Sequence, residues 1–298
     1  MLMSENGRLR RFWLWELTRP AFEDWLANDP APVVIIGIGA IEQHAVHLPL
    51  GCDSLGLAKF IHDVASRTNS VCVHPCWPGY SPHHMEFPGT ITFSWDTLLN
   101  ILLDTISSLA YHGVKRIVLV NYHGGNDNIM KLAAQIARRE YRVMVATPEG
   151  PRNTELAKKI LERTQRYYEV HSCPRETSYA LHYFPELVEM WRLEGWENPT
   201  LIPKDLQEFM DPSRPDYEVV SQIFAASVGP ETHNISKTGQ YSTNDPRAGN
   251  VEEGRAMAEE AMKFLVDFIT TWKKLPVPPG YSDGECGCGD ECHGHPDA

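Results

Sequence analysis

Residues 33–39, with the sequence VVIIGIG, restrict the possible fold more than any other part of the chain. The run is apolar, rich in β-branched side chains, and ends in glycine. A strand of this composition is typical of a parallel sheet in which both faces are covered. We therefore expect a sheet with helices packed on each side.

The alternation of strand and helix continues along the chain. Further strands are predicted at residues 71–73, 116–120 and 142–146, and helices at residues 53–67, 95–111, 126–139, 153–168, 176–184 and 251–272. Such alternation indicates an α/β fold with a mostly parallel sheet flanked by helices on both faces. We expect one domain over residues 1–280, with a long and largely irregular excursion between residues 194 and 249.

Composition and charge narrow the class of partner. The 298 residues are 42% hydrophobic, enough for a buried core, and Lys+Arg 27 against Asp+Glu 39 give a net charge of −12. An acidic chain without a basic stripe is a poor match for nucleic acid or an anionic membrane. No apolar stretch approaches the ~20 residues of a membrane-spanning helix, and the run at residues 12–15 is too short for a signal peptide. We expect a cytoplasmic protein that acts on a small molecule, without nucleic-acid or membrane partners.

Cysteine usage separates the C-terminal tail from the rest. Of seven cysteines, four are scattered through the expected domain, so no disulfide framework is predicted. The other three lie in CGCGDECHGH, residues 286–295, which has metal-binding side chains but no apolar residue that could pack. We expect residues 281–298 to be a disordered tail, dispensable for catalysis, that binds metal either adventitiously or to help load the active site.

Two polar clusters follow predicted strands, where sites form in parallel sheets. Glu42, His44 and Asp53 follow the first strand, and His123 lies in NYHGGN, residues 121–126, directly after the strand at 116–120. Each cluster alone has a simpler explanation: solvated side chains with Asp53 as a helix cap, or a glycine turn. Together, at the ends of adjacent strands, their nitrogen and oxygen ligands favour a site for Zn²⁺, Mn²⁺ or Fe²⁺.

A third cluster, HSCPRETS at residues 171–178, lies at the start of a predicted helix. Its carboxylate, Glu176, has two interpretations. It either favours the helix start electrostatically or serves as an additional metal ligand.

These motifs make the sequence resemble the creatininase family of metal-dependent hydrolases. The resemblance covers about residues 12–272, and the combination is specific because the motifs lie in the family's order. They are GAIEQH at 39–44 with Asp53, FPGT at 87–90, NYHGGN at 121–126, and ETS at 176–178 five residues after His171.

The resemblance implies a creatininase-like α/β domain with two divalent metal ions per subunit, Zn, Mn or Fe, at the strand ends. By its motifs, Glu42 and His123 would bind one ion, His44 would bind the second, and Asp53 would bridge both. It also implies a homo-oligomer, commonly a hexamer. The aromatic segment at residues 12–15 is then either a contact surface or part of the chain's own core.

Two further roles follow from the resemblance. Creatininase itself carries a carboxylate where this chain has Gly125, which cannot ligate, so Glu176 is the expected remaining ligand. His171 matches the family's catalytic histidine and would give the leaving group its proton. The alternative for His171 is a solvent-facing side chain at a helix start.

The expected reaction is attack of a metal-bridged hydroxide on the carbonyl of a small polar substrate. We expect a cyclic or linear amide, which would make the protein an amidohydrolase. The alternative is hydrolytic ring opening of a carbocyclic keto-inositol, and a non-catalytic metal-binding protein comes third.

Creatinine is not the expected substrate, because the chain departs from creatininase around the site. Tyr167 replaces a tryptophan of creatininase, and the loop at residues 79–86 also differs. Exposed loop residues of this kind are solvated at least as often as they bind a ligand. The candidate substrate-binding residues are His83, His84, Glu86, Thr90 and Tyr167.

Overall fold

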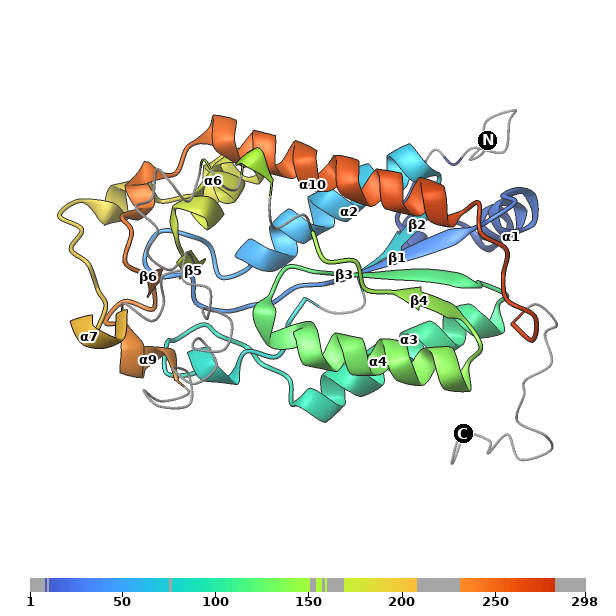
Figure 1. Ribbon diagram of the computed structural model, residues 1–298, viewed down its shortest axis with the longest axis horizontal. Helices are drawn as coiled ribbons and strands as arrows, with labels where there is room; N and C mark the ends of the chain where they lie inside the picture. Colours follow the sequence, from blue (N-terminus) through green and yellow to red (C-terminus); the bar gives the residue numbers. More distant parts are fainter. Residues whose placement is uncertain are drawn as a thin grey trace.

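The computed structural model describes Leu9, residues 11–74, 77–150, 154–156, Lys159, and residues 169–207 and 231–281. A four-stranded parallel sheet with the strand order β2-β1-β3-β4 lies at its centre (Figure 1). Every residue of the inner strand β1 is buried, as the sequence predicts for a strand covered on both faces. The four strands are β1 (Val33–Ile38), β2 (Val71–Val73), β3 (Arg116–Asn121) and β4 (Met144–Ala146).

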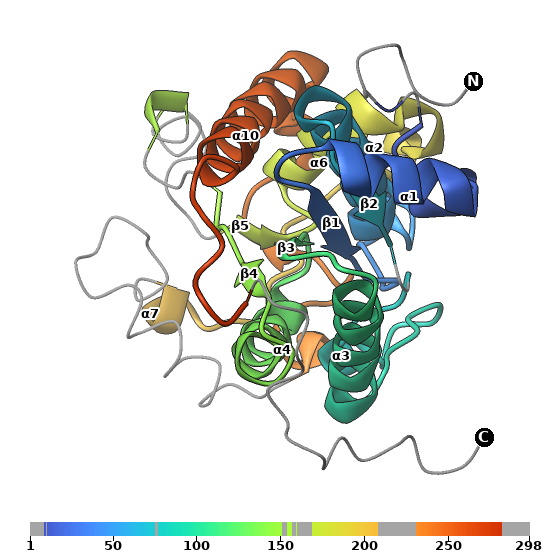
Figure 2. The ribbon, with the colours of Figure 1, turned by 90° about the vertical axis from the view of Figure 1, so that its right-hand side faces the viewer.

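Successive residues of β1 point to opposite faces of the sheet and enter two separate hydrophobic cores. Val34 and Ile36 pack in the core shared with α3 and α4. Val33 and Ile35 pack in the core shared with α2, α6 and α10. Figure 2 shows these two groups of helices on either side of the sheet. The helices are α2 (Cys52–Thr68), α3 (Trp95–Tyr111), α4 (Asp127–Glu140), α6 (Pro174–Tyr183) and α10 (Val251–Trp272).

The predicted α/β architecture is confirmed, although several local details differ from prediction. Helix α2 begins at Cys52 after Gly51, so Asp53 lies in the first turn and does not cap the helix. Strand β4 begins two residues late, because Arg142 has a φ of 52°, which a strand cannot adopt. Helix α1 (Arg19–Asn28) was not predicted, although Thr18 caps it and a proline lies in its first turn.

The chain after β4 contributes short elements. The predicted helix at 153–168 and the expected tail at 281–298 lie almost entirely outside the described residues. β5 (Glu169–His171) pairs antiparallel with β6 (Tyr241–Ser242), which joins the expected excursion to the site. The described parts of the excursion also hold α7 (Lys204–Gln207) and α9 (Thr232–Ile235). Short 3₁₀ turns lie at Leu14–Glu16, Pro82–His84, Gly124–Asn126, Pro185–Leu187, Met190–Leu193 and Pro246–Ala248.

Two surface expectations can be compared with the structure. No helix among the described residues is both long and apolar enough to cross a bilayer. Phe12 packs against both cores, and its carbonyl accepts a hydrogen bond from the Cys72 amide at 2.7 Å. Trp15 stacks on Trp13 and remains 60% exposed. The aromatic segment at 12–15 therefore packs largely on the chain's own core, and assembly into a homo-oligomer stays a prediction.

The buried side chain of Asn126 joins the segments that follow three strands. Its amide nitrogen donates to the carbonyl of Gly39 at 2.9 Å and to Oδ1 of Asn121 at 3.1 Å. Its Oδ1 accepts a hydrogen bond from the Tyr80 amide at 2.9 Å. The segments after β1, β2 and β3 are thereby held together at one end of the sheet.

Replacing Asn126 by alanine should lower the free energy of unfolding by about 2 kcal/mol or more, because buried partners on Gly39 and Tyr80 lose their hydrogen bonds. Urea denaturation measures the change. Asn128→Ala removes an exposed amide two residues further on, in the first turn of α4, and should change stability by less than about 0.5 kcal/mol. Equal effects of the two substitutions would show that the Asn126 amide does not hold these segments.

Candidate metal centre

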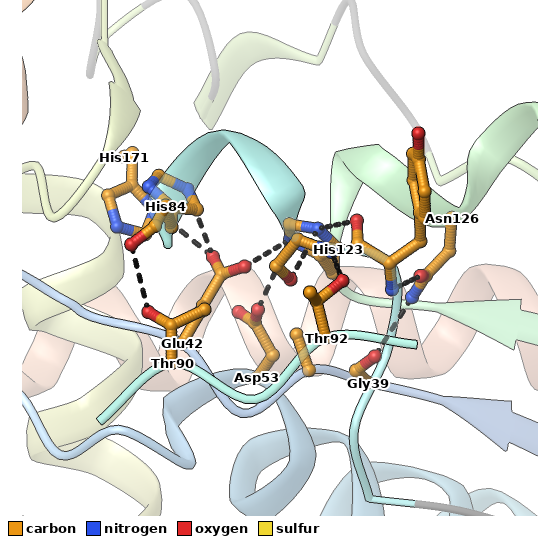
Figure 3. A network of polar contacts seen from close by, with 12 residues as sticks. Gly39, Glu42, Asp53, His84, Thr90, Thr92, His123, Asn126 and His171 are labelled. Carbon is orange, nitrogen blue, oxygen red and sulfur yellow. Dashed lines mark hydrogen bonds and ion pairs between the residues drawn. The ribbon is translucent and has the colours of Figure 1, made fainter. Parts of the chain in front are cut away.

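The two polar clusters predicted from the sequence meet at the carboxyl ends of β1 and β3. Ile38 of β1 pairs with Asn121 of β3, so the loops after both strands leave the sheet side by side. Helices α2 and α6 and strand β5 bring further side chains to the same place. Figure 3 shows two of them, Asp53 and His171, beside Glu42. The side chains gathered there are Glu42, His44, Asp53, His84, His123, His171 and Glu176.

The carboxylate of Glu42 lies at the centre of this cluster and is completely buried. Its Oε2 lies 3.1 Å from Nδ1 of His123. Its Oε1 lies 3.5 Å from Nε2 of His84 and 3.5 Å from Nδ1 of His171. Neither oxygen has a hydrogen bond of normal geometry to any described residue. The charge of Glu42 therefore depends on imidazoles, or on a cation, for compensation.

Asp53 projects from the first turn of α2 into the gap between two imidazoles. Its Oδ1 lies 3.4 Å from Nε2 of His44, and its Oδ2 lies 3.6 Å from Nδ1 of His123. A carboxylate with one oxygen toward each imidazole has the arrangement required of a bridge between two metal ions.

His44 and His123 are held in the orientation of metal ligands. Nδ1 of His44 donates to the backbone carbonyl of Glu42 at 3.2 Å. Nε2 of His123 donates to the carbonyl of Tyr80 at 3.0 Å. A backbone acceptor on one ring nitrogen leaves the other nitrogen available to a proton or a metal ion, which is the usual arrangement around metal-binding histidines. These inner atoms, Nε2 of His44 and Nδ1 of His123, both face the carboxylates.

Glu176 stands where a further ligand is needed. It lies in the first turn of α6, its Oε2 is 3.9 Å from Nε2 of His44, and the same oxygen accepts a hydrogen bond from the Ser172 amide at 2.5 Å. No side chain fits at Gly125, because a Cβ there would lie 2.2 Å from the Tyr80 carbonyl oxygen.

The charges in the cluster strongly influence one another. Burial disfavours the charged form of Glu42, but attraction to His123, His171 and His44 outweighs it and holds the pKa of Glu42 well below its usual range. Burial also disfavours the cation of His123, and here the carboxylates of Glu42 and Asp53 prevail and raise the pKa to about 9. The metal-free site therefore attracts positive charge.

The residues present fit a pair of divalent metal ions. Four buried atoms of the cluster have no hydrogen-bond partner in the described part of the chain: both oxygens of Glu42, Nε2 of His44 and Oδ2 of Asp53. Buried polar atoms are normally paired, so these atoms are suited to bind a cation. Mixed carboxylate and imidazole ligands suit Zn²⁺, Mn²⁺ and Fe²⁺. Three groups bring ligand atoms within 4.8 Å of one another: Glu42, His44 and Asp53; His44, His171 and Glu176; and Glu42, His84 and His171.

His171 is buried at the end of β5 and does not face solvent. Its Nε2 donates to the carbonyl of Gln43 at 2.7 Å, so the bare Nδ1 faces Glu42. Its ring centroid lies 4.3 Å from that of His44. The position therefore allows contact with both halves of the cluster.

The predicted substrate-binding residues divide into three groups. His84 is buried against Glu42, and the ring of His83 stacks on that of His123 with centroids 5.7 Å apart. The hydroxyl of Thr90 accepts a hydrogen bond from the backbone N–H of Gln43 and donates one to the backbone carbonyl of His84. Thr90 therefore supports the loop beneath these rings. Glu86 is exposed, and Tyr167 lies outside the described residues.

Sequence reasoning missed the side chain of Gln43. It contacts Gly239 from the excursion, Ala45 in its own loop, and both His84 and His171. The sequence did offer one indication of its importance: Gln43 lies between two predicted metal ligands, Glu42 and His44, in a loop that follows a buried strand. Gly239 and Thr232, which also contact this part of the site, carried no comparable signal because they lie far away in the sequence.

Comparisons with known proteins agree with these features. A family model described as "Creatininase: Creatinine amidohydrolase" matches residues 15–269. A 3-dehydro-scyllo-inosose hydrolase of Thermotoga maritima is 25% identical over 172 residues, which are 54% of this chain and 54% of that protein. A creatinine amidohydrolase of Pseudomonas putida is 27% identical over 214 residues, 67% of this chain and 82% of the relative. A mycofactocin precursor peptide peptidase of Mycobacterium ulcerans is 30% identical over 259 residues, 84% of this chain and 88% of the relative. The match thus spans about half the length of the first relative.

Solved structures share the fold. The structure named "Creatininase Mn" has a TM-score of 0.67 at 22% identity and covers 89% of this chain and 100% of its own. A mutant creatininase described as "Zn-Zn type" has a TM-score of 0.66 at 22% identity, with 91% and 100% covered. At 22% identity these similarities show a shared fold and no more.

If Asp53 bridges two ions, Asp53→Ala should remove both metals, whereas His44→Ala should lose mainly one. The reason is that the Asp53 carboxylate lies between both imidazoles, while His44 faces only one side of the cluster. Metal content per chain after dialysis measures the difference. Glu86→Ala, at an exposed position of a nearby loop, serves as the control and should retain both ions. A full metal complement in Asp53→Ala would contradict the assignment.

Proposed function

Because the chain belongs to the creatininase family of hydrolases, we propose that it is a two-metal amidohydrolase that cleaves the C–N bond of a small polar amide. The observation that carries the proposal is the fully buried carboxylate of Glu42, whose oxygens face three imidazoles without a hydrogen bond of normal geometry. A buried charge in this condition is costly unless a cation compensates it.

The proposed ligands divide into two sets that share one carboxylate. When bound, two divalent ions, Zn, Mn or Fe, would polarise a carbonyl group and acidify a water molecule. Figure 3 shows three members of the set, Glu42, Asp53 and His123, pointing toward one another. Glu42 and His123 would hold one ion, His44 and Glu176 the other, and Asp53 would contribute an oxygen to each.

The proposed proton carrier is His171. Its Nε2 hydrogen is committed to the Gln43 carbonyl, so only the bare Nδ1 can accept a proton from the centre. Burial and the repulsion of His44 lower the pKa of His171, which keeps the ring neutral and ready to accept. A proton taken up at Nδ1 can then be passed to a leaving nitrogen, which must be protonated as the C–N bond breaks.

The relatives favour an amide over other carbonyl substrates. Creatinine amidohydrolase and the mycofactocin precursor peptide peptidase are both named for hydrolysis of C–N bonds, and the peptidase matches 84% of this chain. The net charge of −12 argues against a strongly anionic substrate. These observations support a neutral or cationic cyclic or linear amide.

The Thermotoga maritima relative supports a second candidate, hydrolytic ring opening of a carbocyclic keto-inositol. The attacked carbonyl would then adjoin a C–C bond, and His171 would pass its proton to carbon instead of nitrogen. The same ligands would serve both reactions.

Turnover distinguishes these candidates. Purified protein loaded with Zn²⁺ or Mn²⁺ should hydrolyse cyclic amides or formamides and lose activity on chelation of the metal. Hydrolysis of keto-inositols alone would replace the proposal with the second candidate. Full metal content without turnover of any of the three classes would favour a non-catalytic metal-binding protein.

Glu176→Gln should weaken the second metal ion and reduce turnover by about 100-fold or more while leaving the fold intact, because an amide is a poorer ligand than a carboxylate. Metal content, turnover and thermal unfolding measured together test this. Glu186→Gln makes the same change at an exposed position just beyond α6 and should leave all three unchanged. An active Glu176→Gln variant with two ions would mean that the ligand comes from elsewhere.

A further inference from the structure

Four buried imidazoles surround the carboxylates, and three of them are held in the same way. His44, His123 and His171 each donate an outer ring N–H to a backbone carbonyl, at 3.2, 3.0 and 2.7 Å respectively. A carbonyl oxygen only accepts hydrogen bonds, so the proton of each neutral ring lies on its outer nitrogen. Each of the three therefore presents a bare nitrogen to the centre.

The surroundings of His84 are the reverse. Its outer nitrogen, Nδ1, lies 2.8 Å from the amide nitrogen of Gln43 and 2.8 Å from the hydroxyl of Thr232. The hydroxyl can donate or accept, whereas a carboxamide nitrogen only donates. The Gln43 contact therefore requires a bare Nδ1 on His84.

The orientation of the Gln43 carboxamide is decided by two backbone groups. Its Oε1 accepts a hydrogen bond from the Ala45 amide at 2.9 Å, and its Nε2 donates to the Gly239 carbonyl at 3.0 Å. If the amide were flipped, its oxygen would face the Gly239 carbonyl oxygen and its NH₂ group would face the Ala45 N–H. Neither pair can form a hydrogen bond. The close approach needs a glycine, because a Cβ at position 239 would lie 1.9 Å from Oε1 of Gln43.

The remaining contact of Gln43 does not alter this assignment. The side-chain Nε2 of Gln43 also lies 3.1 Å from Nε2 of His171. That imidazole nitrogen, however, is only 2.7 Å from the backbone carbonyl oxygen of Gln43. The shorter contact requires the hydrogen on Nε2 of His171. The two hydrogens of the Gln43 amide are thus directed to Gly239 and His84.

From this network we propose that Gln43 is a positioning residue that fixes the proton of His84 on Nε2, so that His84 presents an N–H donor beside the bare Nδ1 of His171. Both inner atoms lie 3.5 Å from the same atom, Oε1 of Glu42, and the two rings lie side by side with centroids 4.4 Å apart (Figure 3). The site would contain one hydrogen-bond donor and one proton acceptor at neighbouring positions.

The same assignment decides whether a third metal ion is expected. Glu42, His84 and His171 bring three ligand atoms within 4.8 Å of one another, which taken alone would suit another cation. An imidazole nitrogen that carries a hydrogen cannot ligate a metal. Moving that hydrogen to Nδ1 of His84 would place it against the NH₂ group of Gln43, which is also a donor. His84 is therefore assigned as a donor and not as a ligand.

The role of this donor rests on the proposed hydrolase function. Negative charge develops on a carbonyl oxygen under attack, and a fixed N–H in a site that excludes water stabilises that charge without reorganisation. His84 would donate to this oxygen, while His171 would accept the proton released on the attacking side. No proton is lost, since the one taken up at His171 leaves with the product.

Nitrogen NMR of the zinc-loaded, histidine-labelled full chain tests the assignment without reference to turnover. Chemical shifts distinguish protonated from bare ring nitrogens, and the His84→Gln variant identifies the His84 signals. We expect a protonated Nε2 and a bare Nδ1 on His84 in the wild-type protein. A protonated Nδ1 on His84, or evidence that the ring binds zinc, would overturn the proposal.

Two variants show which neighbour sets the proton. Gln43→Glu replaces the donor opposite His84 with an acceptor, so Nδ1 of His84 should become protonated. Thr232→Val removes the hydroxyl but leaves Gln43 in place, so the wild-type pattern should persist. A change of tautomer in Thr232→Val with none in Gln43→Glu would assign the role to Thr232 and contradict the proposal.

On a substrate identified by the screen, His84→Phe should reduce kcat by about 10²–10³-fold, as for other donors to a developing oxyanion. His84→Gln retains an amide donor near the position of Nε2 and should recover part of this loss at an unchanged metal content. Equal losses in both variants would contradict the donor role. Absence of any substrate would contradict the hydrolase proposal but leave the NMR result intact, so the two failures are distinguishable.

Discussion

The burial of one carboxylate, that of Glu42, determines how the rest of the site is arranged. A buried anion without hydrogen bonds is unstable in a folded protein unless positive charge lies close to it. Here three imidazoles lie within 3.5 Å of its two oxygens, and the Asp53 carboxylate adds negative charge nearby. The cluster therefore requires protons or metal ions, and its bare ring nitrogens favour the metal ions.

The parallel sheet makes this concentration of charge possible. Adjacent strands β1 and β3 end in register, so two short loops bring their polar residues to one place without crossing the core. The hydrogen bonds of the Asn126 side chain then hold the loops together. Because the supporting helices lie in two separate cores on either side of the sheet, the loops can carry polar residues without disturbing either core.

Under the proposed function, the segments around the centre would select the substrate more than the proposed metal ligands would. Relatives of this chain are named for an amide, a peptide and a keto-inositol, and a metal pair that activates water and a carbonyl can serve all three. Two segments border the proposed metal ligands without belonging to them. One is the loop that carries His83 and His84, and the other is the excursion that carries Thr232 and Gly239. They contact the site through hydrogen bonds that a change of a few residues would alter.

The sequence by itself determined the α/β class, most helix and strand positions, and the polar clusters that follow β1 and β3. These features are local, because hydrophobic periodicity and the residues after a buried strand can be recognised within short windows. The bounds of α3 and α10 were predicted to the residue, while α1 was missed and Asp53 was misplaced as a cap. Only the tertiary structure decided that Gln43 meets Gly239 and that His84 faces a donor while its three neighbours face carbonyl oxygens. Such contacts join residues nearly two hundred positions apart, and the position of a ring proton depends on every atom within hydrogen-bonding distance, which no local pattern records.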